Sequence, residues 1–236
     1  MLTLLTGSTL STVKVDVDGM ERMALVYASE APGPKPILFA FHGKSSSAEN
    51  VAKEMDLQTL WPEAVVVYPE GDLGPSQPRG WHTKTSEDNQ DIRFWDRLLP
   101  EIKKRFNGDG KRVYAIGHSN GAIFMYTLWA GRGSDLAGVG ILEGYSHWES
   151  RFVPKPAFVS LGDKDEVIKP AQQTPSINLL FQSNESSQEG KPFGTYGTYY
   201  KGVQPVVLWR YPGGHMPSHD AFEAIVKFFK SVDTPK

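Results

Sequence analysis

One stretch, residues 113–130, constrains the fold of this chain more than any other. It starts with the apolar run 113–116, passes through residues 117–121 (Gly-His-Ser-Asn-Gly) and continues into a segment compatible with a helix. A strand, tight turn and helix with the pattern G-x-S-x-G is typical of a nucleophile elbow, which lifts a serine hydroxyl above a sheet. The pattern therefore predicts that Ser119 is a nucleophile. The alternative is a chance match, since Gly and Ser are common in turns.

The elbow also needs its glycines. Strand and helix pass so close in such a turn that Gly117 and Gly121 are expected where no side chain fits.

The segments around this stretch alternate between strand-like and helix-like patterns. Buried strands are expected at residues 37–41, 65–68, 136–142, 157–161 and 206–209. Helices are expected at residues 48–60, at 92–106 with Asp88 as its cap and 107–110 as its end, in the first half of 170–202, and after Ser218.

The beginning of the chain has a different pattern. Apolar and polar residues alternate over 13–17, then Asp18-Gly19 precedes a second strand-like run, 20–27, which predicts a hairpin. Residues 71–89 are predicted to form a long surface loop, and 183–197 another loop. The whole pattern predicts an α/β fold with a mostly parallel central sheet, a leading antiparallel hairpin and helices on both faces.

Composition narrows the class of protein. The 236 residues fit one domain, and 25 basic against 27 acidic residues give no reason to expect nucleic acid or an anionic membrane as a partner. The chain has no cysteine, which excludes disulfides and thiolate chemistry. No apolar run approaches the roughly 20 residues of a membrane span. The compartment stays open, cytoplasmic or secreted after loss of a signal peptide that this chain does not carry, and the oligomeric state stays open too.

A serine nucleophile needs a base, and that base needs a carboxylate to orient it. His215 is the preferred base because it follows the last strand directly, at the end of the sheet where the serine is expected. His219 is the competitor, but it is predicted to lie in the first turn of the final helix and to point away. For the acid, Asp165 is preferred, Asp163 is second, and Glu143 after the preceding strand is a weaker candidate.

Two backbone amides are predicted to form an oxyanion hole, those of Lys44 and Asn120. Candidate substrate-contacting residues are His42, Trp81, His118, Tyr145 and Trp148. Packing is the alternative for each of them and the favoured one for His118, and Tyr196, Tyr199 and Tyr200 are further aromatic candidates for the rim of the site. No histidine and carboxylate spacing suggests a catalytic zinc, and we expect no cofactor.

These motifs resemble those of a known family. The matching stretches are residues 41–43, 60–69, 91–95, 117–121, 162–165 and 213–215. In these the chain is similar to polyhydroxybutyrate depolymerase-like esterases of the α/β-hydrolase fold, which are related to feruloyl and acetylxylan esterases. The resemblance implies a single catalytic domain over residues 1–236, with Ser119 as nucleophile, Asp165 as acid and His215 as base.

The resemblance has two departures. Relatives often have a glycine or cysteine where Lys44 stands, and many have His-Gly where this chain has Leu161-Gly162. Extracellular polymer depolymerases also often carry a separate polymer-binding domain, and none is indicated here. We therefore expect a soluble ester substrate, aromatic, sugar-linked or a hydroxyalkanoate oligomer. The alternatives are a serine peptidase or thioesterase on the same fold, and a non-catalytic binding protein.

Overall fold

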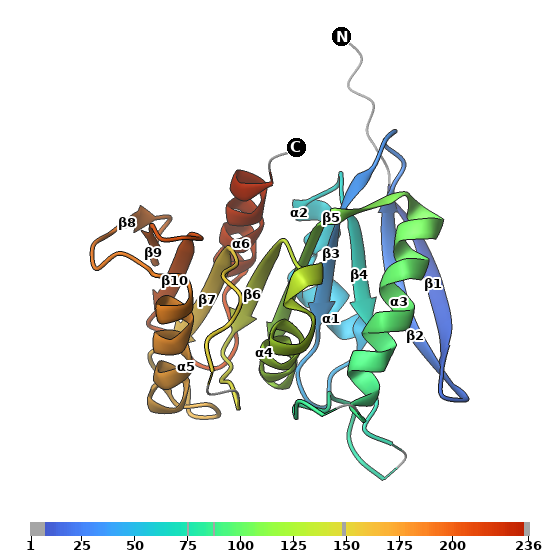
Figure 1. Cartoon of the computed structure of the whole chain (residues 1–236), viewed down its shortest axis with the longest axis horizontal. Coiled ribbons are helices and arrows are strands. Elements are labelled where there is room, and N and C mark those ends of the chain that lie inside the picture. The colour runs from blue at the N-terminus through green and yellow to red at the C-terminus, as the bar shows by residue number, and fades with distance from the viewer. Residues whose placement is uncertain (1–7, 75, 87, 148–149, 234–236) are drawn as a thin grey trace.

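The computed structural model describes residues 8–74, 76–86, 88–147 and 150–233. At its centre lies one ten-stranded sheet in the order β1-β2-β4-β3-β5-β6-β7-β10-β9-β8 (Figure 1). The strands are β1 Ser8–Val17, β2 Met20–Ser29, β3 Lys35–Phe41, β4 Val65–Pro69, β5 Gly108–His118, β6 Gly138–Leu142, β7 Ala157–Gly162, β8 Gly190–Phe193, β9 Gly197–Tyr200 and β10 Val206–Tyr211. The central strands run parallel to one another; they are β4, β3, β5, β6, β7 and β10. The strands on either side, β1 and β2 at one edge and β9 and β8 at the other, pair antiparallel.

Helices cover both faces of the sheet. They are α1 Ala48–Met55, α2 Leu57–Leu60, α3 Gln90–Phe106, α4 Asn120–Arg132, α5 Pro170–Ser183 and α6 His219–Val232, with the 3-10 turn η1 Gly133–Asp135. Helices α3, α4 and α5 cover one face and α1, α2 and α6 the other (Figure 1). Side chains of the first three form one apolar core with the sheet, and those of the other three form a second core. Successive residues of β3 alternate between the two: Phe39 packs in the first core and Leu38 in the second. A strand buried on both faces explains the continuous apolar runs of the sequence.

The predicted α/β architecture is thus confirmed, including the leading hairpin. Asp18 and Gly19 form its two-residue turn with φ of 54° and 83°. Such turns match the twist of the paired strands, which is why Asp-Gly between two alternating runs predicts them well.

Some element boundaries differ from the prediction. Asn89, not Asp88, caps α3: its side-chain oxygen accepts hydrogen bonds from the amides of Asp91 and Ile92. Residues 48–60 form two helices because Asp56 adopts a left-handed conformation with φ of 44°.

The prediction of a loop over residues 183–197 is wrong in its second half. Residues 190–193 and 197–200 form the β8–β9 hairpin, which extends the sheet beyond β10. Gly194 allows the reversal with φ of 64°. The polar and glycine-rich composition hid these strands because edge strands need not be apolar on both faces.

The topology brings the chemistry-bearing turns to one edge. Parallel strands present their carboxyl ends on the same side of a sheet. The turns after β3, β5, β6, β7 and β10 therefore meet there, and each carries a residue singled out in the sequence: Lys44, Ser119, Glu143, Asp165 and His215.

Candidate active site

Ser119 stands at the sharp turn between β5 and α4. Its backbone has φ of 55° and ψ of −120°, a conformation that side chains rarely adopt. A Cβ atom on Gly117 would lie 2.1 Å from the carbonyl oxygen of Gly121, and one on Gly121 would lie 2.3 Å from that of Phe41. The prediction that both glycines are needed for the close approach of strand and helix is confirmed.

Three of the predicted residues form one chain of hydrogen bonds. The Oγ of Ser119 lies 2.8 Å from Nε2 of His215, and Nδ1 of His215 lies 2.9 Å from Oδ2 of Asp165. An ionised carboxylate at Asp165 fixes the imidazole with a proton on Nδ1, which leaves Nε2 free to accept the serine proton. The three side chains come from the ends of three different strands.

The Asp165 carboxylate is held firmly. It is buried, and its Oδ1 accepts hydrogen bonds from the amides of Val167 and Ile168, both at 2.9 Å. Its Oδ2 also accepts from the side-chain amide of Gln173 at 3.2 Å. These donors fix the position of the carboxylate beside His215.

The competing candidates lie elsewhere. Asp163 accepts a hydrogen bond from Nε of the exposed Arg210 at 2.6 Å, whereas His215 pairs with Asp165. His219 lies in the first turn of α6, as predicted, beside Glu223 at 3.6 Å.

The loop that carries His215 is anchored at three successive carbonyl groups. The hydroxyl of Tyr211 donates to the carbonyl of Gly214 at 2.7 Å, and the carbonyl of Met216 is a second acceptor at 3.1 Å. Nε2 of His118 lies 2.9 Å from the carbonyl of His215 itself. Burial lowers the pKa of His118 to about 4, so this imidazole is neutral and donates from Nε2. Packing, the favoured alternative for His118, agrees with this contact, although its ring also borders the cavity.

The two residues predicted to supply the oxyanion donors lie beside the serine. A Cβ atom on Gly43 would lie 3.4 Å from Cβ of Ser119, so the turn that carries Lys44 runs beside the elbow. Asn120 is the first residue of α4, and amides in the first turn of a helix have no carbonyl partner within the helix.

His42, predicted as a substrate contact, forms hydrogen bonds within the protein through both ring nitrogens. Its side chain is fully buried, Nδ1 donates to the carbonyl of Gly43 at 2.7 Å, and Nε2 accepts from the amide of Gly71 at 2.9 Å. Burial lowers its pKa. His42 therefore ties the turn after β3 to the start of the long loop.

Trp81, also predicted as a substrate contact, is buried in the core. The indole stacks on Phe124 with ring centroids 5.3 Å apart, meets Phe41 edge-on at 5.0 Å, and donates from Nε1 to the carbonyl of His42 at 2.8 Å. A ring with three such partners fixes the loop rather than covering a ligand. The sequence suggested a contact because a tryptophan among glycines and prolines has no local signal of burial.

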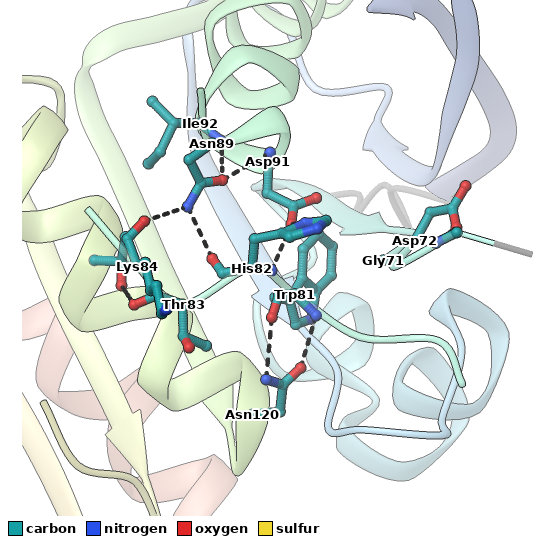
Figure 2. A network of polar contacts seen from close by, with 12 residues as sticks. Gly71, Asp72, Trp81, His82, Thr83, Lys84, Asn89, Asp91, Ile92 and Asn120 are labelled. Atoms are coloured by element: carbon teal, nitrogen blue, oxygen red, sulfur yellow. Dashed lines mark hydrogen bonds and ion pairs between the residues drawn. The ribbon is translucent and has the colours of Figure 1, made fainter. Parts of the chain in front are cut away.

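A network of hydrogen bonds holds the loop over residues 71–89 to the helices α3 and α4 (Figure 2). The side chain of Asn120 accepts from the amide of Trp81 at 2.7 Å and donates to its carbonyl at 3.2 Å. Further along, Asp91 accepts from the amide of His82 at 2.7 Å and from its Nδ1 at 2.9 Å, while Arg22 pairs with the same buried carboxylate. This hydrogen bond to Asp91 raises the pKa of His82. The loop is thereby joined to the residue that follows the serine.

A cavity of about 310 Å³ opens at Ser119 and His215. Its lining residues are Gly43, Lys44, Ser46, Val51, Glu54, His118, Ser119, Val167, His215 and Met216. Sequence reasoning missed Ser46, Val51, Glu54, Val167 and Met216, although Val167 lies two residues after the predicted acid and Met216 directly follows the predicted base. Two cavities of about 510 and 530 Å³ lie elsewhere. Neither Ser119 nor any histidine is among the described residues that line them.

The predicted aromatic rim is not found among the described residues. Tyr145 packs edge-on against His147 and does not line the cavity. Trp148 lies outside the described residues. Tyr196 packs on Trp209 and Tyr200 on Phe181, at the far edge of the sheet, and Tyr199 lies on the same strand, β9.

Within the described ranges, no group of three or more histidine, cysteine or acidic residues could hold a metal ion. In the same part of the chain, none of the helices has the length and apolar character needed to span a bilayer.

Comparisons with known proteins give one curated relative and many similar folds. No protein-family model matches this chain. The chain is similar to a bifunctional acetylxylan esterase/xylanase from Neocallimastix patriciarum, with 26% identity over 241 residues. The match covers 92% of this chain but 34% of that protein, so the chain spans about a third of the length of its relative.

Solved structures of esterases share the fold. An acetyl xylan esterase from Aspergillus awamori superposes with a TM-score of 0.75 at 12% identity, covering 93% of this chain and 99% of that one. A ferulic acid esterase gives 0.69 at 12% identity, covering 96% and 99%, and a Bacillus cereus carboxylesterase gives 0.62 at 17%, covering 95% of each. The chain has the α/β-hydrolase fold of these proteins.

Proposed function

We propose that this protein is a serine hydrolase that cleaves carboxylic esters of small acyl groups through an acyl-enzyme intermediate. One observation carries the proposal: the continuous chain from Ser119 Oγ to His215 Nε2 at 2.8 Å and from His215 Nδ1 to Asp165 Oδ2 at 2.9 Å. A serine hydroxyl is a weak nucleophile unless a base removes its proton as it attacks. This arrangement supplies that base, already oriented.

The reaction proceeds in two halves. Ser119 attacks the ester carbonyl while His215 takes its proton, and the resulting imidazolium gives that proton to the departing alcohol. Water then attacks the acyl-enzyme by the same route, which releases the carboxylic acid and returns the proton to Ser119. Asp165 stays ionised throughout and stabilises the imidazolium.

Two backbone amides receive the negative charge that develops on the carbonyl oxygen. The amide of Asn120 points from the first turn of α4, where the helix dipole also favours an anion. The amide of Lys44 is the second donor, on the turn beside the elbow. Because these donors belong to the backbone, replacement of a glycine or cysteine by Lys44 leaves them in place.

The cavity supports a small substrate. Its volume of about 310 Å³ is near the lower end of the range for ligand pockets, roughly 300 to 1,000 Å³. Val51, Val167 and Met216 offer apolar contact to a short acyl chain, while Lys44 and Glu54 offer polar contact to a hydroxylated alcohol. Among the described residues, no aromatic ring other than the imidazoles of His118 and His215 borders this cavity, so a short acyl ester of a polyol suits it better than an aromatic one.

The comparisons support ester hydrolysis as the reaction class. An acetylxylan esterase, a ferulic acid esterase and a carboxylesterase share this fold, and the curated relative carries an acetylxylan esterase activity in its name. Among their substrates, an acetyl ester of a sugar agrees best with the dimensions and the polar wall of the cavity.

Replacement of Ser119 by alanine tests the proposal. Ser119→Ala should fold like the wild type and lose roughly a thousandfold or more in kcat on p-nitrophenyl acetate. A fluorophosphonate should label the wild type at Ser119 alone. Labelling of the variant at the wild-type rate, or equal turnover by both proteins, would exclude Ser119. An amide and a thioester with the same acyl group, assayed beside acetylated sugars, would identify a peptidase or thioesterase instead.

A further inference from the structure

Glu143 is a buried carboxyl group that the proposed reaction does not use. It follows β6 at the catalytic edge of the sheet, and its side chain is fully buried. Its backbone has φ of 49°, in the left-handed region that is uncommon for residues other than glycine. A glutamate held in this conformation at the end of a central strand has a fixed position beside the proposed triad.

The two carboxyl groups in this region have unequal surroundings. Asp165 accepts four hydrogen bonds, whereas Glu143 accepts one, from the Ser160 hydroxyl to its Oε1. The other oxygen of Glu143, Oε2, is buried without a hydrogen-bond partner in the described structure. Burial raises the pKa of Glu143 to about 8, and the charge of Asp165 acts in the same direction. Adjacent carboxyl groups whose surroundings differ in this way divide into one ionised and one neutral member.

Tyr211, on β10, is the other hydroxyl-bearing side chain near the Glu143 carboxyl group. Tyr211 has one proton, and this proton is directed at the carbonyl groups of Gly214 and Met216, on either side of His215. A neutral Glu143 can donate its own proton to the oxygen of Tyr211 without disturbing that arrangement. The protons then form one directed series, from Ser160 to Glu143, to Tyr211 and to the loop.

We propose that Glu143 is a positioning residue that keeps its proton and donates it to Tyr211, so that Tyr211 holds the loop of the catalytic base. The inference rests on the proposed function. An ionised Glu143 could only accept, so Tyr211 would turn its proton away from the loop carbonyls. Ionisation of Glu143 therefore loosens His215 and ends catalysis at alkaline pH.

The groups that face Glu143 come from three elements. Ser160 lies on β7, Asp165 on the loop after β7, and Tyr211 on β10. Of these, Tyr211 stays neutral, since burial raises its pKa far above the range of the assay. His118, at the end of β5, holds the same loop but is already neutral above about pH 4.

The pH profile of kcat/KM tests the proposal. Wild-type turnover of p-nitrophenyl acetate should fall above about pH 8. Glu143→Gln, which can still accept from Ser160 and donate to Tyr211, should keep neutral activity within about threefold and lose the alkaline decline. Glu143→Ala should lose roughly tenfold or more at every pH, and the exposed Glu189→Gln should keep the wild-type profile. An alkaline decline in Glu143→Gln identical to that of the wild type would overturn the proposal.

Two further measurements separate this proposal from the proposed function. In a Tyr211→Phe background, Glu143→Gln should no longer alter the pH profile, because the series of protons is already broken. Carbon NMR of glutamate-labelled protein reads the Glu143 carboxyl without any turnover. A signal titrating near pH 8, absent from Glu143→Gln and accompanied by shifts of the Gly214 and Met216 amides, supports the proposal even if no ester is cleaved. A signal titrating near its ordinary value refutes it, whatever the activity.

Discussion

At the scale of single residues, position within the sheet gives three similar acids different roles. Asp163, Asp165 and Glu143 all follow strands that end at the catalytic edge. Asp163 pairs with Arg210 at the surface, Asp165 is buried among hydrogen-bond donors, and Glu143 is buried with one donor. The charge of each carboxyl group follows from the number of donors and the access of water. Sequence alone ranks these residues only by their spacing from a strand.

The choice of acid can be tested by a matched pair of variants. Asp165→Asn should lower kcat by roughly ten-thousandfold, because an amide cannot hold the imidazole in the required tautomer. Asp163→Asn should change kcat by less than about threefold, since it removes only an exposed ion pair with Arg210. Both are checked by steady-state kinetics on p-nitrophenyl acetate, with circular dichroism to verify folding. An active Asp165→Asn beside an inactive Asp163→Asn would reverse the assignment.

At the scale of elements, the loop over residues 71–89 acts as part of the scaffold. Its buried Trp81 occupies the core between β3 and α4, and its backbone holds the side chain of Asn120 (Figure 2). The buried Arg22–Asp91 pair and His82 fix the far end of the loop. Long loops are often functional, and this one acts through the backbone it positions rather than through a substrate contact.

Truncation of this tryptophan should reveal its structural role. Trp81→Ala should lower the free energy of unfolding by about 3 to 5 kcal/mol, as expected for a buried aromatic residue. Activity should fall by a similar factor on p-nitrophenyl acetate and on a feruloyl ester, because the displaced loop affects Asn120 and not substrate choice. Trp81→Phe, which keeps the ring but not the bond to His42, should lose less stability. A selective loss on the feruloyl ester with an unchanged melting temperature would restore the role of substrate contact.

At the scale of the whole molecule, buried ionisable groups make stability depend on pH. The pKa of Glu143 is raised from 4.5 to about 8 in the folded protein, so its contribution to stability is complete below about pH 4.5 and is lost as the pH rises through 8. The pKa of His118 is lowered from 6.5 to about 4, so stability is lost as the pH falls from 6.5 through 4. The two ranges overlap from about pH 4.5 to 6.5, where the two effects oppose each other, so stability should be highest there.

Denaturant unfolding of Glu143→Gln at several pH values tests this dependence. Relative to the wild type, the variant should become more stable between pH 5 and pH 8, with a limiting slope of about 1.4 kcal/mol per pH unit. The acid side of the profile, which His118 governs, should not change. A constant difference between the two proteins across this range would show that Glu143 keeps an ordinary pKa when folded.

The sequence by itself predicted the elements whose signals are local. Continuous apolar runs, the Asp18-Gly19 turn and the glycines around Ser119 each report a backbone requirement, and the structure confirms the strands, hairpin and elbow that they predict. The order of elements along the chain then placed Ser119, Asp165 and His215 at one edge of the sheet. The β8–β9 hairpin escaped prediction because edge strands do not require a continuous apolar pattern.

Only the tertiary structure decided what each side chain faces. The sequence predicted His42 and Trp81 as substrate contacts, but contacts with Gly71, Phe41 and Phe124 bury them. The charge of Glu143 likewise depends on Ser160, Asp165 and Tyr211, which lie 17 or more residues away along the chain. Burial and hydrogen bonding set the pKa and the role of a side chain, and both are properties of neighbours that the fold brings together.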